Sequence, residues 1–288
     1  MISILLTGGS GFIGRNLLEL LTERFKITAP SHDALDLTNA QDVKEFFKKN
    51  RFDMVIHAAG VGSLRTQSNS AGVYELNYKI FRNLTEHSKC FGRMIFFGSG
   101  AEYGKQQPII KAKESDCKKV LPEDEYGRSK CAISEYIAQH EQIANLRCFG
   151  VFGKYEDYRT RFISNIICQS LAGKAITVKQ NAVFDYIYIN DLAKIVEYFL
   201  VNEPKEKFYN IGSGQGIELL SIARIVKELT ANPHEIVVEQ TGLGREYTCD
   251  NSKLLGELGN FEFTSINSAI SELIEWYRKN WQSIDQRA

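Results

Sequence analysis

A glycine-rich turn joins an apolar strand to an amphipathic helix at the start of the chain, and this feature constrains the fold most. Residues 2–6 form a short apolar run that suits a buried strand, and apolar side chains then recur at helical spacing at Phe12, Ile13, Leu17, Leu18 and Leu21. In the turn, Gly8 permits a tight bend, Gly11 lets the backbone approach a pyrophosphate, and Gly14 lets the helix lie close to the strand. The amide groups at the positive end of the helix dipole then face the phosphates. This order of strand, turn and helix predicts a dinucleotide-binding site at Gly8, Gly11, Phe12, Ile13 and Gly14.

Tyr126 and Lys130 stand four residues apart in a segment that carries helical periodicity up to about His140. Residues 122–124 have the character of a helix start, so the two side chains are expected on one helix face. A tyrosine and a lysine at this spacing also occur by chance in many helices, so the spacing by itself does not identify a site. An ammonium group beside the phenol favours the phenolate, and we expect it to lower the pKa of Tyr126 from its usual value of about 10 towards neutrality. The pair therefore predicts a general acid or base at Tyr126.

Ser99 follows an apolar run at residues 94–98, where this expected strand ends. In a doubly wound sheet the carboxyl ends of the strands line the ligand crevice, so a hydroxyl there can bond a substrate oxygen. An isolated serine in such a place more often bonds its own backbone in a turn, but Ser99 lies between the glycine turn and the Tyr126 helix. We interpret Ser99, Tyr126 and Lys130 as the catalytic groups of a nicotinamide-dependent enzyme that acts on a carbonyl or a carbinol.

Apolar strands alternate with helical stretches through the first half of the chain. The expected parallel strands are residues 2–6, 27–29, 54–57, 94–98 and 145–148. Such alternation predicts an α/β fold, a doubly wound parallel sheet with helices on both faces. After about residue 150 the pattern becomes irregular, and residues 154–161, rich in charges and tyrosines, are expected to form a loop over the cleft.

Composition argues against several classes of protein. The chain has 35 lysines and arginines and 35 aspartates and glutamates, so nothing indicates a surface for nucleic acid or membrane. No run of about 18 apolar residues is present, and Met1 leads directly into the first expected strand, which leaves no room for a signal peptide. The six cysteines show no Cys-x-x-Cys pairing and are expected to be reduced thiols of a cytoplasmic protein, and no metal site is predicted.

These motifs resemble the extended short-chain dehydrogenase/reductases, the NAD-dependent epimerase/dehydratase family that modifies nucleotide sugars. The resemblance covers nearly the full length and includes Asp36-Leu37-Thr38, His57-Ala58-Ala59-Gly60 and a structural asparagine, Asn77. Residues 146–153, 184–191 and 209–212 match the segments that frame the sugar-nucleotide pocket. The resemblance implies an NADP or NAD cofactor that is contacted by the glycine turn and by Asp36, Leu37, Ala58, Ala59, Gly60, Asn77, Tyr126 and Lys130.

The resemblance also implies a Rossmann-like sheet domain with a smaller, interleaved C-terminal substrate-binding α/β domain. We expect the NAD(P)-binding domain at residues 1–150 plus about 176–210, and the nucleotide-sugar-binding domain at about 151–175 and 211–288. Relatives often dimerise through the helix near residues 81–88 and the helix that carries the catalytic tyrosine, so a homodimer is expected. Phe81, Leu84 and residues 133–137 could supply its apolar face, or they could pack on their own sheet.

Two reactions of the family use the same catalytic groups. In a ketoreductase, NAD(P)H gives hydride to a 4-keto sugar while Tyr126 protonates the alkoxide, Lys130 holds the nicotinamide ribose and Ser99 binds the carbonyl oxygen. In a 4-epimerase, tightly held NAD+ first oxidises C4 and hydride then returns to the other face. The short connection at residues 29–38 resembles dTDP-4-dehydrorhamnose reductase and GDP-fucose synthase.

That connection predicts a reductase of the C4 carbonyl of a nucleotide-activated 4-keto-6-deoxy sugar, in deoxysugar biosynthesis for a cell-surface polysaccharide. A nucleotide-sugar 4-epimerase is the alternative. A non-catalytic NAD(P)-binding sensor is a third reading, although such proteins usually lose the tyrosine or the lysine.

Ser31 and His32 stand where an NAD enzyme usually carries an acid for the ribose 2′-hydroxyl. A hydroxyl or an imidazole tolerates a 2′-phosphate better than a carboxylate does. Both residues are therefore expected cofactor contacts that favour NADPH. A small shift in strand register would place Asp33 on the ribose and reverse this preference.

Departures from the family restrict the chemistry. Ala101 and Arg161 take the places of a cysteine and a histidine that move protons at ring carbons in GDP-fucose synthase, so C3/C5 epimerisation is disfavoured. Glu102 is displaced from the Asp-Glu pair of the dehydratases, so 4,6-dehydration is disfavoured. Gly150 replaces an asparagine that contacts the sugar nucleotide, and Arg245 matches a position that grips the diphosphate, with an ordinary surface arginine as the alternative. The expected substrate-side residues are Ser99, Ala101, Gly150, Arg161 and Arg245.

Overall fold

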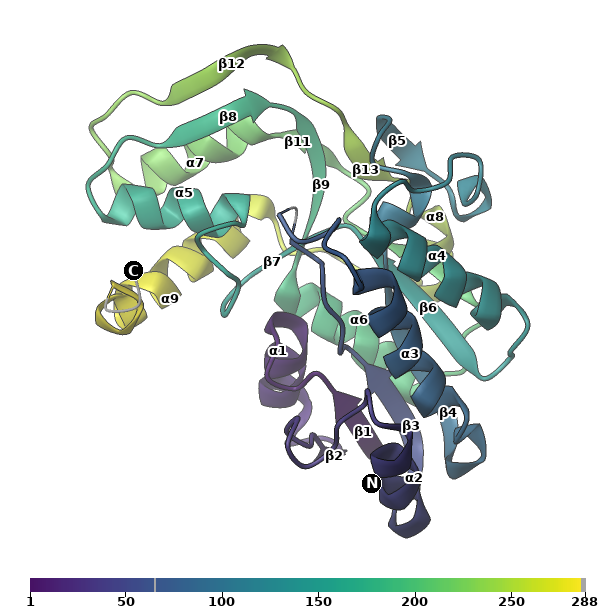
Figure 1. Ribbon diagram of the computed structural model, residues 1–288. Helices are drawn as coiled ribbons and strands as arrows, with labels where there is room; N and C mark the ends of the chain where they lie inside the picture. Colours follow the sequence, from purple (N-terminus) through teal and green to yellow (C-terminus); the bar gives the residue numbers. More distant parts are fainter. Residues whose placement is uncertain (65, 286–288) are drawn as a thin grey trace.

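Six strands form a parallel sheet in the computed structural model, which describes residues 1–64 and 66–285 (Figure 1). In spatial order they are β10 (Phe208–Ile211), β6 (Ile143–Cys148), β4 (Phe91–Ser99), β3 (Phe52–His57), β1 (Ser3–Thr7) and β2 (Lys26–Thr28). Every neighbouring pair of these strands is parallel. The five strands expected from the sequence are present, and their ends differ from the expected ones by only a few residues.

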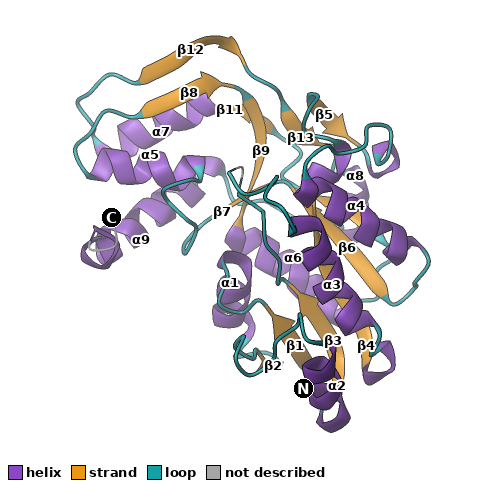
Figure 2. Ribbon diagram, viewed as in Figure 1, coloured by secondary structure: helices purple, strands orange, loops and turns teal. Residues whose placement is uncertain are grey.

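Helices cover both faces of this sheet (Figure 2). α1 (Phe12–Leu21) and α6 (Ile189–Val201) lie on one face, and α2 (Ala40–Lys49), α3 (Val73–Thr85) and α4 (Glu125–Ala138) lie on the other. Successive side chains of a strand point to opposite faces, so Ile4 and Leu6 of β1 pack with α1 and α6 while Leu5 packs with the other three helices. The α/β doubly wound fold is confirmed.

The apolar residues of α3 and α4 that were expected to form a dimer face lie inside this core. Phe81, Leu84, Ile133 and Ile137 are at most 1% exposed, and all four belong to one cluster with strand residues. Of the two alternatives for these residues, an apolar contact between subunits or packing on their own sheet, the structure shows the second. Charged residues of these helices are exposed instead, namely Glu75, Lys79, Arg128 and Glu135.

Local signals set the helix starts. The Asn39 side chain accepts the Gln41 amide at 3.0 Å ahead of α2, and the Asp124 side chain accepts the Gly127 amide at 2.9 Å at the start of α4. The predicted helix start at residues 122–124 is confirmed, and α4 ends at Ala138. The catalytic tyrosine and lysine expected from the sequence therefore lie in the first two turns of α4.

The chain also builds a second, smaller unit. Its central strand β9 (Val183–Tyr188) pairs with β7 (Gly150–Phe152), β11 (Gly216–Glu218) and β13 (Tyr247–Cys249), and β13 pairs with β5 (Ile109–Ala112). β8 (Thr177–Asn181) pairs with β12 (Val237–Leu243), apart from the six-stranded sheet. After β9 the chain returns through α6 and β10 to the large sheet, so the two units are interleaved. The residue numbers expected for the domain boundaries stay a prediction.

Helices complete this second unit. α5 (Phe162–Leu171), α7 (Leu219–Thr230) and α9 (Ile266–Asp285) pack against one another, and α8 (Ser252–Leu258) packs against β10. α9 buries Ile270, Leu273 and Tyr277 on its inner side. Over the part of the chain that the structure describes, no helix is both long and apolar enough to cross a membrane.

The strand order reverses at β1, and this reversal locates the ligand crevice. β1 has β2 on one side and β3 on the other, and the chain crosses from β2 to β3 through α2. In the sheet register Thr7 lies beside His57, and Ser99 lies beside Cys148, each at the carboxyl end of its strand. Open α/β sheets bind ligands outside these ends at the point of reversal. The glycine turn and Ser99 thus belong to the same edge of the sheet.

Candidate active site

The glycine turn packs against the segment that follows β3. Gly8 has a φ of +73°, and a Cβ atom there would lie 2.6 Å from the backbone nitrogen of Ala59. A Cβ atom on Gly14 would lie 2.1 Å from the Gly8 carbonyl oxygen, which no side chain tolerates. The Gly11 amide closes the turn by donating to the Gly8 carbonyl at 3.0 Å, and Phe12 and Ile13 follow as the half-buried first residues of α1. Bare backbone at a helix N-terminus fits a pyrophosphate group.

Asn77 of α3 fixes residues 58–60, which line the other side of this turn. Its side-chain oxygen accepts the Val61 amide at 2.9 Å, and its side-chain nitrogen donates to the Val61 carbonyl at 3.0 Å. The same nitrogen donates to the Ser129 hydroxyl on α4 at 3.2 Å. Because Asn77 is buried, it ties the strand-end segment firmly to both helices.

His57 at the end of β3 is a buried neutral group. Its Nδ1 lies 2.7 Å from Thr7 Oγ1, and its ring contacts Phe81 and Phe96. Burial, assisted by the charge of Lys130, lowers the pKa of His57 to about 3. The imidazole therefore stays uncharged at neutral pH and supports the edge of the sheet.

Asp36 and Leu37, the expected adenine-side residues, follow β2. Asp36 Oδ1 accepts the Thr38 amide at 2.8 Å and the Thr38 hydroxyl at 2.7 Å, and these bonds lower the pKa of Asp36. Leu37 is half-buried, and its carbonyl accepts the Asn83 side chain of α3 at 2.8 Å. The Asp36 carboxylate is thus turned into its own loop, in the manner of an Asx turn.

The residues expected near the ribose 2′ position lie exposed at the edge of the sheet. Ser31, His32 and Asp33 follow the end of β2, and the His32 side chain is 76% exposed. His32 Nδ1 lies 3.9 Å from Asp36 Oδ1. This stretch therefore offers a hydroxyl, an imidazole and one outward carboxylate to a group bound at the edge.

Three hydroxyl groups meet at the end of β4. The Ser99 hydroxyl lies close enough to Tyr126 of α4 and to Tyr247 of β13 to oppose the effect of burial on the pKa of each tyrosine. Ser99 Oγ also accepts the Ala101 amide at 3.1 Å, which holds the serine side chain at the strand end. Burial raises the pKa of Tyr126 to about 12, although the nearby Ser99 hydroxyl and the charge of Arg161 oppose this rise. Tyr126 is therefore protonated at neutral pH and can act as a proton donor.

Lys130 lies one turn further along α4. Its Nζ donates to the Phe97 carbonyl at 2.8 Å and lies 5.5 Å from the centre of the Tyr126 ring. Burial lowers the pKa of Lys130 to about 8, and the Glu102 carboxylate opposes this effect. The predicted lowering of the Tyr126 pKa by Lys130 is wrong for this structure, because the ammonium bonds a backbone carbonyl and burial of the phenol dominates.

Tyr247 joins the cluster without having been singled out from the sequence. It comes from the second unit, where it pairs with Phe184 of β9. A Cβ atom on Gly100 would lie 2.4 Å from the Tyr247 hydroxyl oxygen, so the small residue after Ser99 makes room for this ring. In the sequence, only the position of Tyr247 close to Arg245 could have indicated that it lies near the site.

The other expected substrate-side residues lie in different surroundings, some buried and some exposed. Ala101 is 1% exposed, so its methyl group packs inward. At Gly150 a Cβ atom would lie 2.8 Å from the ring of Tyr186, which explains why this position has no asparagine. Arg245 is exposed, and its Nη1 donates to the Lys105 carbonyl at 3.2 Å. Of these residues, only Arg161 carries a charge close enough to Tyr126 to lower the pKa of its phenol.

Residues 154–161 bridge the two units as a loop between β7 and α5. Near its start, the Tyr155 hydroxyl donates to Glu19 of α1 at 2.9 Å. At its end, Arg161 donates to the carbonyl and the hydroxyl of Ser63, each at 3.4 Å. The loop is thus attached to both sides of the edge where the glycine turn and Ser99 lie.

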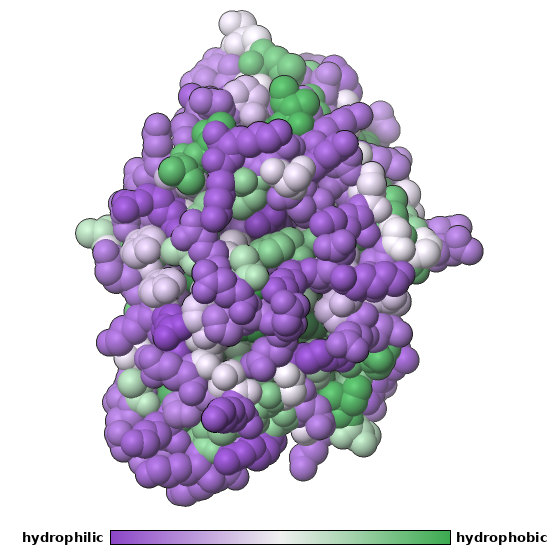
Figure 3. Space-filling view, turned by 90° about the vertical axis from the view of Figure 1, so that its right-hand side faces the viewer, coloured by the Kyte–Doolittle hydropathy of each residue, from purple (hydrophilic) through white to green (hydrophobic). Residues whose placement is uncertain are grey.

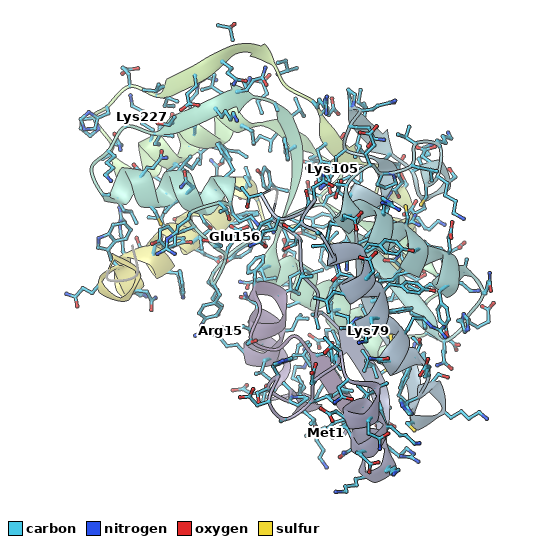
Figure 4. The ribbon with its side chains drawn as sticks, in the orientation of Figure 1. Met1, Arg15, Lys79, Lys105, Glu156 and Lys227 are labelled. Carbon is cyan, nitrogen blue, oxygen red and sulfur yellow. The ribbon has the colours of Figure 1, made fainter. Side chains whose placement is uncertain are left out.

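Glu156 is a buried acid within this loop. The Ser164 hydroxyl donates to its carboxyl group at 2.6 Å, and burial raises the pKa of Glu156 to about 8 while the charge of Arg161 opposes the rise. In Figure 4, Glu156 and Arg15 lie on the side where α1 faces the second unit. Glu156 is therefore largely protonated at neutral pH.

Apolar surface lies recessed between hydrophilic side chains near the middle of the face shown in Figure 3.

Among residues 1–64 and 66–285, no group of three or more His, Cys, Asp or Glu side chains is arranged to hold a metal ion. The six cysteines are free thiols. Burial raises the pKa of Cys148, which neighbours Ser99 in the sheet, to about 12, so this thiol stays protonated.

Proteins similar in sequence or fold bear names of enzymes acting on nucleotide sugars. Residues 4–212 match the NAD dependent epimerase/dehydratase family. A GDP-6-deoxy-D-talose 4-dehydrogenase of Aggregatibacter actinomycetemcomitans is 26% identical over 94% of this chain and 96% of its own. The structure of UDP-glucose 4-epimerase from Thermotoga maritima has a TM-score of 0.85 at 22% identity and covers 97% of this chain and 100% of that one. A GDP-6-OMe-4-keto-L-xylo-heptose reductase from C. jejuni has a TM-score of 0.80 at 20% identity, with 97% and 98% covered. The two structural likenesses show a shared fold.

Proposed function

The chain belongs to the NAD dependent epimerase/dehydratase family, and we propose that it is an NAD(P)H-dependent reductase of the C4 carbonyl of a nucleotide-activated 4-keto-6-deoxy sugar. The observation that carries this proposal is the meeting of Ser99 with a protonated Tyr126, one helical turn from the Lys130 ammonium. Ala101 supplies no acid or base beside them, and Glu102 is buried in an ion pair. This set of groups suits hydride chemistry at one carbinol carbon and not proton transfer at neighbouring ring carbons.

Each residue has a defined part in that reaction. NAD(P)H supplies the hydride when it is bound, and the glycine turn, residues 58–60 and Lys130 would hold it. Tyr126 donates its proton to the oxygen on which negative charge develops, and Ser99 donates a hydrogen bond to the same oxygen. Ser99 and the charge of Arg161 favour the phenolate that remains, and Tyr126 regains a proton from solvent. The carbonyl thus takes up one hydride and one proton and becomes an alcohol.

NADPH is the proposed cofactor because of the residues that follow β2. The Asp36 carboxylate is engaged by Thr38, while Ser31 and His32 stand exposed at the position expected for the 2′ group. A hydroxyl and an imidazole accept a 2′-phosphate without the charge repulsion of a carboxylate. The outward Asp33 is the residue that would favour NADH instead.

A nucleotide-sugar 4-epimerase is the second candidate, and the likeness to UDP-glucose 4-epimerase favours it. It would use Ser99, Tyr126 and Lys130 in both directions, first as base and then as acid. The short connection between β2 and α2 and the similarity to a 4-dehydrogenase support the reductase over it.

Transfer of deuterium separates the two candidates. The enzyme is incubated with NADPH carrying deuterium at the transferable position and a panel of nucleotide-activated 4-keto-6-deoxy sugars, and the product is examined by mass spectrometry and NMR. A reductase places one deuterium at C4 and consumes one cofactor per product. An epimerase converts an intact nucleotide hexose and takes no label from added cofactor, and that result would overturn the reductase.

A further inference from the structure

A buried carboxylate lies directly behind the candidate catalytic serine. Glu102 belongs to η2 (Gly100–Tyr103) and is 0% exposed. Its Oε1 accepts the Ser99 amide at 3.1 Å and the Asn145 side chain at 3.4 Å. Its Oε2 accepts the Ser134 hydroxyl at 2.5 Å and Arg147 Nε at 2.7 Å. The four donors come from β4, α4 and β6, so this one side chain joins three elements around the site.

Arg147 completes the charge balance of this cluster. Its side chain is 3% exposed, and its Nη1 donates to the Tyr103 hydroxyl and the Glu114 carbonyl, each at 3.3 Å. The guanidinium carbon lies 4.7 Å from the centre of the Phe208 ring. Two charges taken out of water in this way depend on each other, because removal of one leaves the other buried and unpaired.

Strand β4 is pressed closely against the cluster. A Cβ atom on Gly98 would lie 2.1 Å from Asn145 Oδ1 and 2.5 Å from Glu102 Oε1. The residue before Ser99 must therefore lack a side chain for the carboxylate to reach the Ser99 amide. The close packing of Gly98 against Asn145 and Glu102 thus sets the position of Ser99.

The same carboxylate holds the catalytic helix. Ser134, which donates to the carboxylate, lies one turn after Lys130 on α4. Cys131 Sγ, also on α4, donates to the main-chain carbonyl of Glu102 at 3.3 Å. From this geometry we propose that Glu102, paired with Arg147, is a positioning residue that fixes Ser99 against the helix bearing Tyr126 and Lys130. The negative charge of the same carboxylate favours the charged form of Lys130. The inference rests on the proposed function insofar as these three groups are the catalytic ones.

Four ionisable groups face Lys130, and Glu102 is the charged one. His57 from β3 is neutral because burial lowers its pKa to about 3, whereas Cys148 from β6 and Tyr126 from α4 are neutral because burial raises each pKa to about 12. The Glu102 carboxylate raises the pKa of Lys130 against the effect of burial. Loss of the Glu102 charge should therefore destabilise the charged form of Lys130 and lower its pKa.

Three variants test the inference: Glu102→Gln, Arg147→Met and the double variant. The pKa of Lys130 is measured from the pH dependence of its acetylation by acetic anhydride, followed by peptide mass spectrometry. We expect Glu102→Gln to lower this pKa by about one unit or more, Arg147→Met to leave it unchanged or raise it, and the double variant to fall between the two. In turnover, Glu102→Gln should lower kcat by roughly 10- to 100-fold and move the alkaline limb of the pH profile to lower pH, with the KM for cofactor changed less.

Glu257→Gln is the matched control, since Glu257 is also a buried carboxylate and accepts the Tyr209 hydroxyl at 2.8 Å in the contact between α8 and β10. It should leave the pKa of Lys130 unchanged. If Glu102→Gln does not fold, Ser134→Ala removes the hydroxyl that α4 donates to the Glu102 carboxylate, together with the hydrogen bond that it accepts from Asn145 at 2.6 Å, and should lower kcat by a few-fold. An unchanged Lys130 pKa in Glu102→Gln, or a fall in activity matched by the Glu257 variant, would overturn the inference. The labelling experiment needs no substrate, so a wrong assignment of the reaction would leave it intact.

Discussion

At the scale of single residues, burial decides the protonation states at the site. The phenol of Tyr126 and the ammonium of Lys130 both lie in a desolvated environment, which disfavours the charged form of each. The spacing in the sequence brings them onto one helix face but contains no information on burial. This is why a lowered Tyr126 pKa was expected and a value of about 12 is found. A protonated tyrosine is the form that a reductase needs for its proton donor.

Removal of the Tyr126 hydroxyl tests its role as proton donor. Tyr126→Phe should lower kcat by roughly 10²- to 10⁴-fold, because general acid catalysis contributes about this much, while NADPH binding measured by fluorescence stays within a few-fold. Tyr136→Phe on the same helix is the control, and it should keep full activity because its ring stacks on His140 away from Ser99. Unchanged turnover in Tyr126→Phe would contradict the mechanism.

His57 should make the fold sensitive to acid. The unfolded chain protonates this histidine near its usual pKa of about 6.5, whereas the folded chain does so only near 3. Between these values the unfolded state binds more protons, so the free energy of unfolding falls as the pH falls, by at most about 1.4 kcal/mol per pH unit.

Urea unfolding of His57→Phe at several pH values checks this expectation. The variant should lose less stability than the wild type between pH 6.5 and 4, because its ring cannot take up a proton. His234→Phe, at an exposed position, should retain the wild-type slope. Identical slopes for wild type and His57→Phe would show that His57 is not held neutral.

At the scale of secondary-structure elements, the contact between the glycine turn and α1 shapes the proposed cofactor site. Gly14→Ala places a methyl group against the Gly8 carbonyl, with 2.1 Å available, so the start of α1 must move away from the turn. NADPH binding, measured by titration calorimetry, should weaken by about 10-fold or more.

Gly256→Ala serves as the control for Gly14→Ala. Gly256 lies in α8 with no atom within 4 Å of an added Cβ, so this change should leave binding intact and stabilise the protein by at most about 1 kcal/mol. Equal cofactor binding by the two variants would argue against a phosphate site at the turn.

The sequence predicted those elements whose signals are local. The strands of the large sheet, the turn after β1 and the Asp124 cap of α4 each follow from periodicity, glycine placement or a capping residue. The resemblance to a family supplied the smaller, interleaved unit. The candidate catalytic groups Ser99 and Tyr126 were expected at one site because a doubly wound sheet brings strand ends together, and in the structure Ser99 lies close enough to Tyr126 to influence its pKa.

Contacts between distant segments could not be read from the sequence. Glu102 was recognised as displaced, but its partner Arg147 lies 45 positions away and becomes visible only when β6 lies beside β4. Tyr247 reaches Ser99 from the second unit for the same kind of reason. The sequence left open whether the apolar face of α3 and α4 packs on the sheet or on a second subunit, because helical periodicity does not reveal which neighbour covers a face; in the structure the sheet covers it.

At the scale of the whole molecule, the candidate site lies where two interleaved units meet. Tyr247 and residues 154–161 come from the smaller unit, whereas Ser63, Glu19 and helix α4, which carries the candidate catalytic residues, belong to the larger one. Substrate recognition should therefore depend on how the two units are held together.

A homodimer remains our prediction for the assembled protein, with the exposed charged rows of α3 and α4 at the contact. Sedimentation equilibrium should give twice the chain mass of 32.7 kDa at low salt. Because the contact would be polar, about 1 M salt should shift the mass towards that of one chain. A single-chain mass at low salt would contradict the prediction.

The central claim is best tested by the absorbance of reduced nicotinamide during turnover. The purified protein is mixed with NADPH or NADH and with each member of a panel of nucleotide-activated 4-keto-6-deoxy sugars. We predict that one member consumes the reduced cofactor in a one-to-one ratio, faster with NADPH, and that Tyr126→Phe abolishes the signal. No consumption with any member, together with NAD+ released when the protein is denatured, would contradict the reductase and favour the 4-epimerase.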